Sequence, residues 1–340
     1  MSPDSLAVEL LAAAAAVAAA IVLATVGGAT TIRRVVLRSA ALLACLATAA
    51  AAGLLWVNRQ VDAYPTWSSL FGTEVPTTVP AGATPAGAGR IVSFTVPGTA
   101  SGLTLPMYAY LPPGYADNST TRYPVIEALH GFPASPLQWL DRLEALTVLD
   151  HEIAAHRMAP TVVLFPYVTP DVAVDTECTN IVRGPHAETF LTRDVPAFAR
   201  AHLRIRAGDG WGLIGYSAGA YCATQLLLRH PGRYAAAASL SGYAQPGIAV
   251  GDGTEHTTYN AAWRLTHLPI PAVALYLACA RTDRKAMRGT RELAGLARYP
   301  ISLTTAFVGG GGHNTRTWVA MEPAAFDWLS TWLGRPANAV

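Results

Sequence analysis

The stretch WGLIGYSAGAYCATQLLLRH, residues 211–230, places an apolar run directly before a Gly-x-Ser-x-Gly motif and a helix-like segment. The run Trp211–Ile214 has the length of a short buried strand, and the residues from Ala218 onward suit a helix. A serine between a strand and a helix sits on a tight turn that exposes its hydroxyl, and flanking glycines relieve the crowding there. The stretch therefore predicts Ser217 as a nucleophile, with a structural turn serine as the alternative.

Short apolar runs alternate with helical stretches on both sides of this motif, which predicts an α/β domain: a mostly parallel sheet with helices on both faces. Eight strands are expected, at Ile91–Val96, Met107–Leu111, Val125–Leu129, Thr161–Phe165, Gly212–Ile214, Ala236–Leu240, Ala272–Ala278 and Ser302–Val308. Helices are expected at Leu137–Ala155, Glu188–His202, Ala218–His230, Arg284–Ala297 and Glu322–Trp332. The first two strands should pair antiparallel at an edge.

Two candidate partners of Ser217 each follow a late strand. With Ser217 they give the order serine, acid, histidine along the chain, which is found in enzymes that carry a serine nucleophile on a strand-to-helix turn. His313 stands in the glycine-rich loop 308–314, which would let its imidazole reach the serine and act as the base. Asp283 follows the next-to-last strand and would orient that imidazole. The arginines beside Asp283 make an ion-pair role the alternative, and Asp252 or Glu255 could supply the acid instead.

The segment LHGFP, residues 129–133, ends the third expected strand. An oxyanion formed on the substrate needs two backbone N–H donors, one from this loop and one from the residue after the nucleophile. We expect these to be Phe132 and Ala218, since Pro133 has no N–H to give. His130 is expected to brace this loop.

Four stretches together resemble the putative-esterase family of α/β hydrolases, which includes feruloyl esterases, S-formylglutathione hydrolase and secreted mycolyltransferases. They are LHGFP, GYSAG with the helix that follows, YLACARTD at 276–283, and GGHNTRTWVAMEPAAFDWL at 311–329. The resemblance spans roughly residues 90–333. It implies the α/β-hydrolase fold, the set Ser217, Asp283 and His313, and Trp318 as an aromatic near the site. The mycolyltransferase branch uses a Glu as its acid, so Asp283 is closer to the esterase branch.

Two uncharged runs, Leu10–Ile32 and Ser39–Asn58, precede this domain, with three arginines between them. Each is about 20 residues long, enough to cross a hydrocarbon core of about 30 Å. They predict two transmembrane helices, and the positive-inside rule puts everything after them outside the cytoplasm. Two alternatives also export the chain: a signal peptide at Arg33–Ala52 and, more faintly, a lipoprotein box at Leu42–Cys45.

We therefore expect three parts: a membrane anchor at 1–60, a linker rich in Pro, Thr, Ala and Gly at 61–89, and a catalytic domain at 90–336. The stretch Tyr243–His267 lacks clear periodicity and is expected to be an insertion or lid.

A polar segment at 175–180 follows the fourth expected strand, near the edge where the site loops gather. Glu177 or Asn180 could contact substrate there, although a solvated loop is the plainer interpretation. Cys178 and Cys222 could form a disulfide, since export permits one. Cys279 is expected to remain a free thiol.

Composition excludes several classes of protein. Hydrophobic residues make up 51% of the chain and charged residues 14%, which excludes intrinsic disorder. A net charge of +2, with no run of Lys and Arg able to cover a phosphate backbone, excludes a general nucleic-acid binder. The four cysteines lack the CxxC spacing of zinc sites.

The sequence thus predicts a membrane-anchored, extracytoplasmic serine esterase with no metal or organic cofactor, acting on a small-molecule, lipid or glycolipid ester. One alternative is an acyltransferase that moves the acyl group to a sugar or lipid alcohol. Another is a hydrolase fold without activity that serves as a scaffold.

Overall fold

A computed structural model describes residues 1–26, 31–61, 64, 66–71, 88–116, 120–171, 173–208 and 210–338. Most of the expected linker at 61–89 lies outside these residues, although residues 67–70 form a one-turn helix, α3 (Trp67–Leu70). The chain divides into two compact units, Met1–Glu74 and Val75–Val340, which are described separately.

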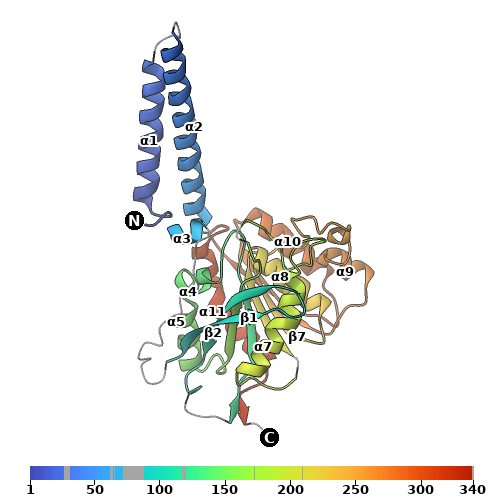
Figure 1. Cartoon of the computed structure of the whole chain (residues 1–340). Coiled ribbons are helices and arrows are strands. Elements are labelled where there is room, and N and C mark those ends of the chain that lie inside the picture. The colour runs from blue at the N-terminus through green and yellow to red at the C-terminus, as the bar shows by residue number, and fades with distance from the viewer. Residues whose placement is uncertain are drawn as a thin grey trace. The chain divides into compact units, whose positions relative to one another are not determined.

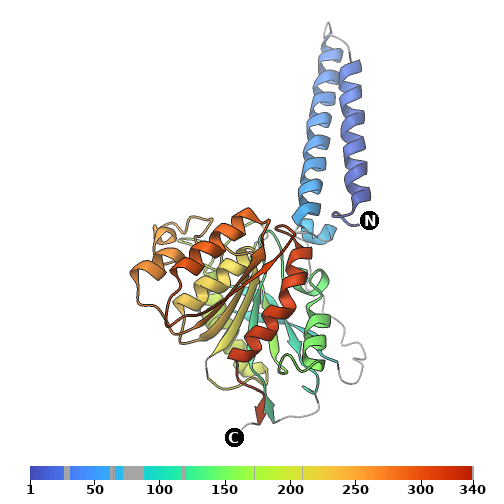
Figure 2. The same cartoon turned by 180° about the vertical axis from the view of Figure 1, so that it is seen from behind.

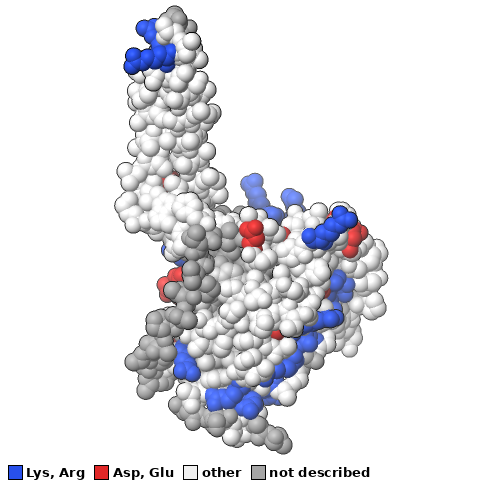
Figure 3. Space-filling model, in the orientation of Figure 1, with Lys and Arg blue, Asp and Glu red and all other residues white. Residues whose placement is uncertain are grey.

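The first unit is a helical hairpin. Its helices α1 (Leu6–Thr25) and α2 (Ile32–Val61) lie side by side, and Glu9 of α1 forms an ion pair with Arg59 of α2. Spans Leu6–Thr25 and Ile32–Arg59 are long and apolar enough to cross a membrane. The three arginines expected in the connecting loop belong instead to the first two turns of α2, at the end of the hairpin where Figure 3 shows Lys and Arg.

The second unit is built on an eight-stranded sheet with the strand order β1-β2-β5-β4-β6-β7-β8-β9. Pairing is parallel from β5 to β9 and antiparallel at β1–β2 and β2–β5, so the expected mostly parallel α/β sheet with an antiparallel edge is confirmed. The strands are β1 (Arg90–Pro97), β2 (Thr104–Leu111), β4 (Val125–Leu129), β5 (Val162–Pro166), β6 (Trp211–Tyr216), β7 (Tyr234–Leu240), β8 (Ala274–Ala280) and β9 (Ser302–Val308). A separate two-stranded ladder joins β3 (Thr121–Arg122) to β10 (Ala337–Asn338).

Helices cover both faces of the sheet, because side chains alternate along each strand and both faces are apolar. One core contains residues of α7, α8, α9 and α10; the other contains residues of α4, α5 and α11. Figure 1 shows α7 and α8 in front of the sheet, and Figure 2 shows α11 across the opposite face. The helices are α4 (Leu137–Asp141), α5 (Ala145–Ala154), α6 (Ala187–Thr189), α7 (Val195–His202), α8 (Ala218–Arg229), α9 (Ala261–His267), α10 (Arg284–Leu296) and α11 (Thr315–Trp332).

Two expected helices are interrupted. The one expected at Leu137–Ala155 divides into α4 and α5 because Glu144 adopts φ 54, a left-handed conformation that a helix does not continue through. The one expected at Glu188–His202 contains a π turn, η1 (Phe190–Asp194), just before Pro196. A proline has no N–H for the usual helical bond, and the wider turn accommodates it.

The stretch Tyr243–His267 is mainly loop, with one 3-10 turn, η2 (Thr254–His256), and then α9. It runs from the end of β7 toward β8, so it borders the edge of the sheet where parallel strands end. Ligands of such sheets bind beyond the carboxyl ends of the strands.

Candidate active site

Ser217 occupies the turn between β6 and α8, at φ 55 and ψ −121. This backbone conformation is uncommon for a residue with a side chain and is typical of functional turns. The motif needs both glycines: a Cβ on Gly215 would lie 2.1 Å from the carbonyl oxygen of Gly219, and one on Gly219 would lie 2.1 Å from that of Leu129. Close backbone approach, rather than flexibility, therefore explains the Gly-x-Ser-x-Gly pattern.

Ser217, His313 and Asp283 lie in one hydrogen-bonded line. The Oγ of Ser217 is 2.7 Å from Nε2 of His313, and Nδ1 of His313 is 2.7 Å from Oδ2 of Asp283. The serine comes from the β6–α8 turn, the aspartate from the β8–α10 turn and the histidine from the loop after β9. The fold thus joins three residues spread over nearly a hundred positions of the chain, in the arrangement that a serine nucleophile requires.

Asp283 is buried and caps α10, since its second oxygen accepts a hydrogen bond from the N–H of Ala286 at 3.1 Å. Burial raises the pKa of this carboxyl, but the hydrogen bonds from His313 and from backbone N–H groups outweigh it and hold the pKa below its usual value. An ionised partner is what stabilises a histidine that gains a proton. The alternative acids bond within their own loop: Asp252 with Thr254, and Glu255 with Val250.

The loop after β4 lies directly against the nucleophile turn. A Cβ on Gly131 would be 2.8 Å from Tyr216 and 3.2 Å from Ser217. The peptide between Phe132 and Pro133 is cis. This closeness fits the expected oxyanion donors, Phe132 and Ala218, whose role stays a proposal.

His130 is buried behind this loop and links it to the segment after β5. Its Nε2 accepts the N–H of Val168 at 3.2 Å, so Nδ1 carries the proton and donates to the carbonyl of Gly131 at 2.8 Å. Burial lowers the pKa of His130 to about 4, so the ring is neutral at ordinary pH. It is a positioning residue for the loop, as expected.

Trp318 lies beneath the histidine. Its ring meets that of His313 edge-on at 5.3 Å and stacks on that of Tyr216 at 4.6 Å. Only 3% of the residue is exposed. In this position the Trp318 ring packs against the imidazole of His313. Contact of Trp318 with substrate stays a prediction.

Glu177 is buried in the loop between β5 and α6, where its carboxylate accepts hydrogen bonds from the hydroxyl of Tyr243 and from the N–H of Gly247 at 2.7 Å. Burial, more than any neighbouring charge, raises its pKa to about 7. The carboxylate therefore fastens the start of the expected lid to this loop. Asn180, the other substrate-binding candidate, bonds through its side chain to Thr189.

A disulfide joins Cys178 to Cys222, with the Cα atoms 5.5 Å apart. It links the loop that carries Glu177 to α8, five residues past Ser217. Cys279 is a buried free thiol.

Sequence reasoning missed a second cluster around Glu188, in α6. This buried carboxylate accepts hydrogen bonds from Arg229 at 2.7 and 3.1 Å, from His230 at 2.7 Å and from the hydroxyl of Tyr259. Only the adjacent Arg229-His230 pair hinted at it. The cluster ties the C-terminal end of α8 to α6 and to the lid.

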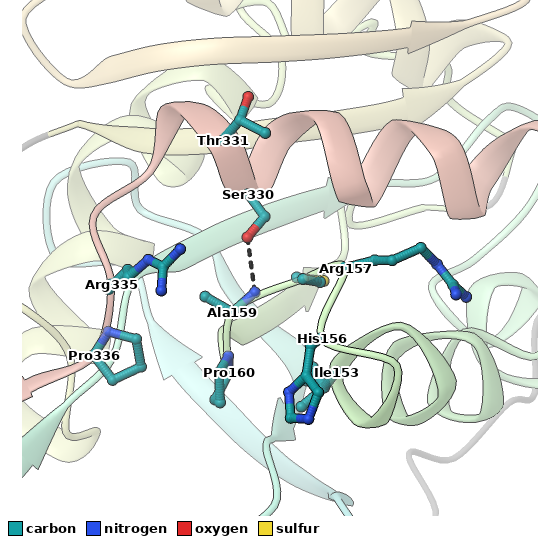
Figure 4. Close-up of a pocket in the computed structure, with 10 residues that line it drawn as sticks. Ile153, His156, Arg157, Ala159, Pro160, Ser330, Thr331, Arg335 and Pro336 are labelled. Atoms are coloured by element: carbon teal, nitrogen blue, oxygen red, sulfur yellow. Dashed lines mark hydrogen bonds between the residues drawn. The ribbon is translucent and has the colours of Figure 1, made fainter.

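Within the described residues, no group of three His, Cys, Asp or Glu side chains is arranged to hold a metal ion. A cavity of about 470 Å³ opens beside Ser330 and Arg335 and contains no residue of the candidate site (Figure 4). Ser330 lies 15 residues along α11 from Thr315, or about 22 Å along the helix axis. We therefore give this cavity no role in the chemistry.

Comparisons with known proteins identify the family and the fold of the chain. Residues 100–321 match the model of a family described as "Putative esterase". An uncharacterised protein of Corynebacterium glutamicum is 25% identical over 240 residues, which are 66% of this chain and 56% of that protein. The chain therefore spans little more than half of that relative.

Solved structures share the fold at low sequence identity. A ferulic acid esterase superposes with a TM-score of 0.63 at 17% identity, covering 72% of this chain and 99% of that one. An S-formylglutathione hydrolase from Agrobacterium tumefaciens gives 0.61 at 15%, covering 73% and 97%. MPT51 of Mycobacterium tuberculosis gives 0.54 at 16%, covering 72% and 98%. These matches confirm the α/β-hydrolase fold.

Proposed function

The chain belongs to the putative-esterase family of α/β hydrolases, and from that premise we propose that it is a membrane-anchored serine esterase whose nucleophile is Ser217. The family assigns it to the carboxylic ester hydrolases. One observation carries the residue assignment: both contacts of the line from Ser217 through His313 to Asp283 are 2.7 Å long.

In the proposed reaction, His313 takes the proton from Ser217 as Oγ attacks the ester carbonyl. Asp283 stabilises the imidazolium that results, since its carboxyl is ionised. The N–H groups of Phe132 and Ala218 hold the negative charge that forms on the carbonyl oxygen. His313 then returns the proton to the departing alcohol, leaving an acyl group on Ser217.

Water completes the cycle by attacking the acyl-enzyme with His313 again as the base, which releases the acid and restores the serine. The side chain of His313 is 35% exposed, so water has access to the imidazole. This exposure meets the requirement of hydrolysis for a water molecule beside His313.

The two apolar spans of the N-terminal hairpin support a membrane anchor. We propose that the three arginines near the start of α2 stay in the cytoplasm, which puts the catalytic unit on the other side of the membrane. A disulfide between Cys178 and Cys222 suits such an oxidising compartment.

The test uses the full chain in a neutral detergent, with a fluorophosphonate probe and p-nitrophenyl acetate. We expect the probe to label the wild type and not Ser217→Ala, and ester turnover to fall by about 10⁴-fold or more in that variant. Ser302→Ala, an exposed serine at the start of β9, is the matched control and should behave like the wild type.

Turnover of Ser217→Ala within about tenfold of the wild type would overturn the assigned nucleophile. A wild type that neither reacts with the probe nor hydrolyses the ester would support a scaffold instead. Adding a sugar as an acceptor distinguishes the esterase from the acyltransferase. An acyltransferase would form the acylated sugar in place of the free acid.

A further inference from the structure

The helix α10 carries an exposed band of positive charge that begins at the candidate site. We define the cationic rim as Arg281, Arg284, Lys285 and Arg288, all exposed. Asp283, the proposed catalytic acid, lies between the first two. In Figure 3, Lys and Arg side chains stand out along the upper edge of this unit, where Figure 1 labels α10.

These four cations have no acidic partner in the described part of the chain. None of them forms an ion pair there, unlike the half-buried Arg229, which pairs with the buried Glu188. The nearest acid along α10 outside the site is Glu292, which is half-buried and accepts a hydrogen bond from Gln245. The rim therefore holds four cations around the single carboxylate of Asp283, even though the net charge of the chain is only +2.

The helix itself gains little from these cations. Arg284 and Lys285 stand in the first turn of α10, where the positive end of the helix dipole repels them, and the N-cap carboxylate of Asp283 offsets part of this repulsion. Arg288 is four residues from a like charge, Arg284, and four from an opposite one, Glu292, so its helical neighbours nearly cancel. Helix stability therefore does not account for four cations at this place beside the site.

Two members of the rim are held beside the triad acid by aromatic rings. The guanidinium of Arg281 lies 5.1 Å from the ring centre of Phe307, near the end of β9, and Nζ of Lys285 lies 5.0 Å from that of Tyr243. The Tyr243 ring in turn stacks at 5.2 Å on that of Tyr221, one turn past the nucleophile. The cations therefore flank Asp283 on the sides of both β9 and the lid.

We propose that the cationic rim binds an anionic group, a carboxylate or a phosphate, carried by the ester substrate. The proposal rests on the proposed function, since it names a substrate class for the same Ser217. A fixed cluster of one sign beside a site raises the local concentration of an oppositely charged substrate and speeds its association. Such attraction acts over about 10 Å at 0.1 M salt, and it weakens as salt is added.

The test uses the full chain and compares two 4-nitrophenyl esters that differ in charge. One is mono-4-nitrophenyl adipate, which is anionic, and the other is its neutral methyl ester. We expect the wild type to prefer the anionic ester in kcat/KM by about tenfold at low ionic strength, and to lose this preference as NaCl is added. Inorganic phosphate should compete with the anionic ester more than with the neutral one.

The variant is Arg284→Gln with Arg288→Gln, because neither side chain makes a hydrogen bond or ring contact with the described residues. We expect it to lower the preference by about three- to tenfold, mainly through a higher KM for the anionic ester. The control removes the same charge elsewhere: Arg193→Gln on η1 with Arg298→Gln, which lies beyond the end of α10, about 20 Å along the helix axis from its start. It should keep the preference.

Equal kcat/KM for the two esters in the wild type, or an equal loss of preference in both double variants, would overturn the proposal. A membrane role for the rim would instead give turnover that depends on anionic lipid, with no difference between the esters, when the chain is placed in nanodiscs with and without phosphatidylglycerol. Either result leaves the proposed function standing if turnover still requires Ser217. Only the absence of Ser217-dependent turnover of both esters would overturn the proposed function.

Discussion

The two flanks of the candidate site use charge in opposite ways. On the α8 flank, Glu188 is buried and bonded to Arg229 and His230, and a disulfide fastens α8 to the loop that carries Glu177. On the α10 flank, the cationic rim is exposed and has no acidic partner within the described residues. Buried groups must be paired to be tolerated, whereas exposed unpaired charge stays available to a ligand. One flank holds the site in place, and the other is suited to binding.

The α8 flank itself contains two glutamates in different electrostatic surroundings. Burial by itself favours the protonated form of both carboxyls and so acts to raise both pKa values. At Glu188 the hydrogen bonds from His230 and Arg229 outweigh burial, and the pKa falls to about 2. Glu177 has a tyrosine and backbone N–H groups as partners but no cation, and its pKa rises to about 7. The presence of a cation, rather than burial, decides the direction of the shift.

The largest effect is expected at Asp283, where the α10 flank begins. In Asp283→Asn the side-chain oxygen can still cap α10, but the amide favours the wrong tautomer of His313. We expect kcat to fall by about 10⁴-fold with little change in the free energy of unfolding. Kinetics with p-nitrophenyl acetate and urea unfolding measure the two quantities. A variant with near wild-type kcat would refute the role of Asp283.

The next effect tests how firmly the α8 flank is fastened. The disulfide closes a loop across a separation of 44 residues, and losing that constraint should cost about 4 kcal/mol of the free energy of unfolding, mainly by freeing the unfolded chain. Cys178→Ala with Cys222→Ala should therefore shift urea unfolding of the catalytic unit strongly. Cys279→Ser is the control, because it removes a buried thiol and leaves the disulfide intact. A reductant should lower its free energy of unfolding by as much as it lowers that of the wild type. No shift in the double variant would show that the cross-link does not stabilise this flank.

Removing the charge of Glu188 should lower the free energy of unfolding somewhat less than removing the disulfide does. The pKa of about 2, against an ordinary value of 4.5, corresponds to about 3 kcal/mol of stability at neutral pH. This contribution is present above pH 4.5 and is lost as the pH falls toward 2. Glu188→Gln should therefore lower the free energy of unfolding by about 3 kcal/mol at pH 7 and by much less at pH 3. Arg284→Gln with Arg288→Gln should change the free energy of unfolding little. An equal loss in this variant and in Glu188→Gln would show that the two flanks do not differ in how they use charge.

The last effect, at Glu177, is of similar size and has the opposite dependence on pH. Because the folded state raises the pKa of Glu177 to about 7, it binds a proton more tightly than the unfolded state does. The stability that this gives is complete below pH 4.5 and is lost as the pH rises through 7, amounting to about 3 kcal/mol. Glu177→Gln should therefore flatten the fall in unfolding free energy between pH 5 and 7.5, measured with urea. An unchanged slope would show that Glu177 titrates normally.

The fold and the hydrogen-bonded line from Ser217 to Asp283 could be predicted from the sequence because their signals are local. The strand, turn and helix around Ser217 follow one another in the chain, and the glycines mark a close approach that only a bare Cα permits. The alternation of apolar and helical runs fixed the sheet, while Glu144 and Pro196 interrupted helices that periodicity alone continued.

Local sequence is enough to predict where the strands, turns and helices lie and the order serine, acid, histidine along the chain. Which charges are paired depends on the tertiary structure: Glu177 meets Tyr243 across 66 positions and Glu188 meets Tyr259 across 71, while the cations around Asp283 form no ion pair within the described residues. The physical reason is that burial and pairing depend on what distant segments bring to the same place. Local sequence sets the conformation of a segment, but the free energy of a charge depends on all the groups packed around it.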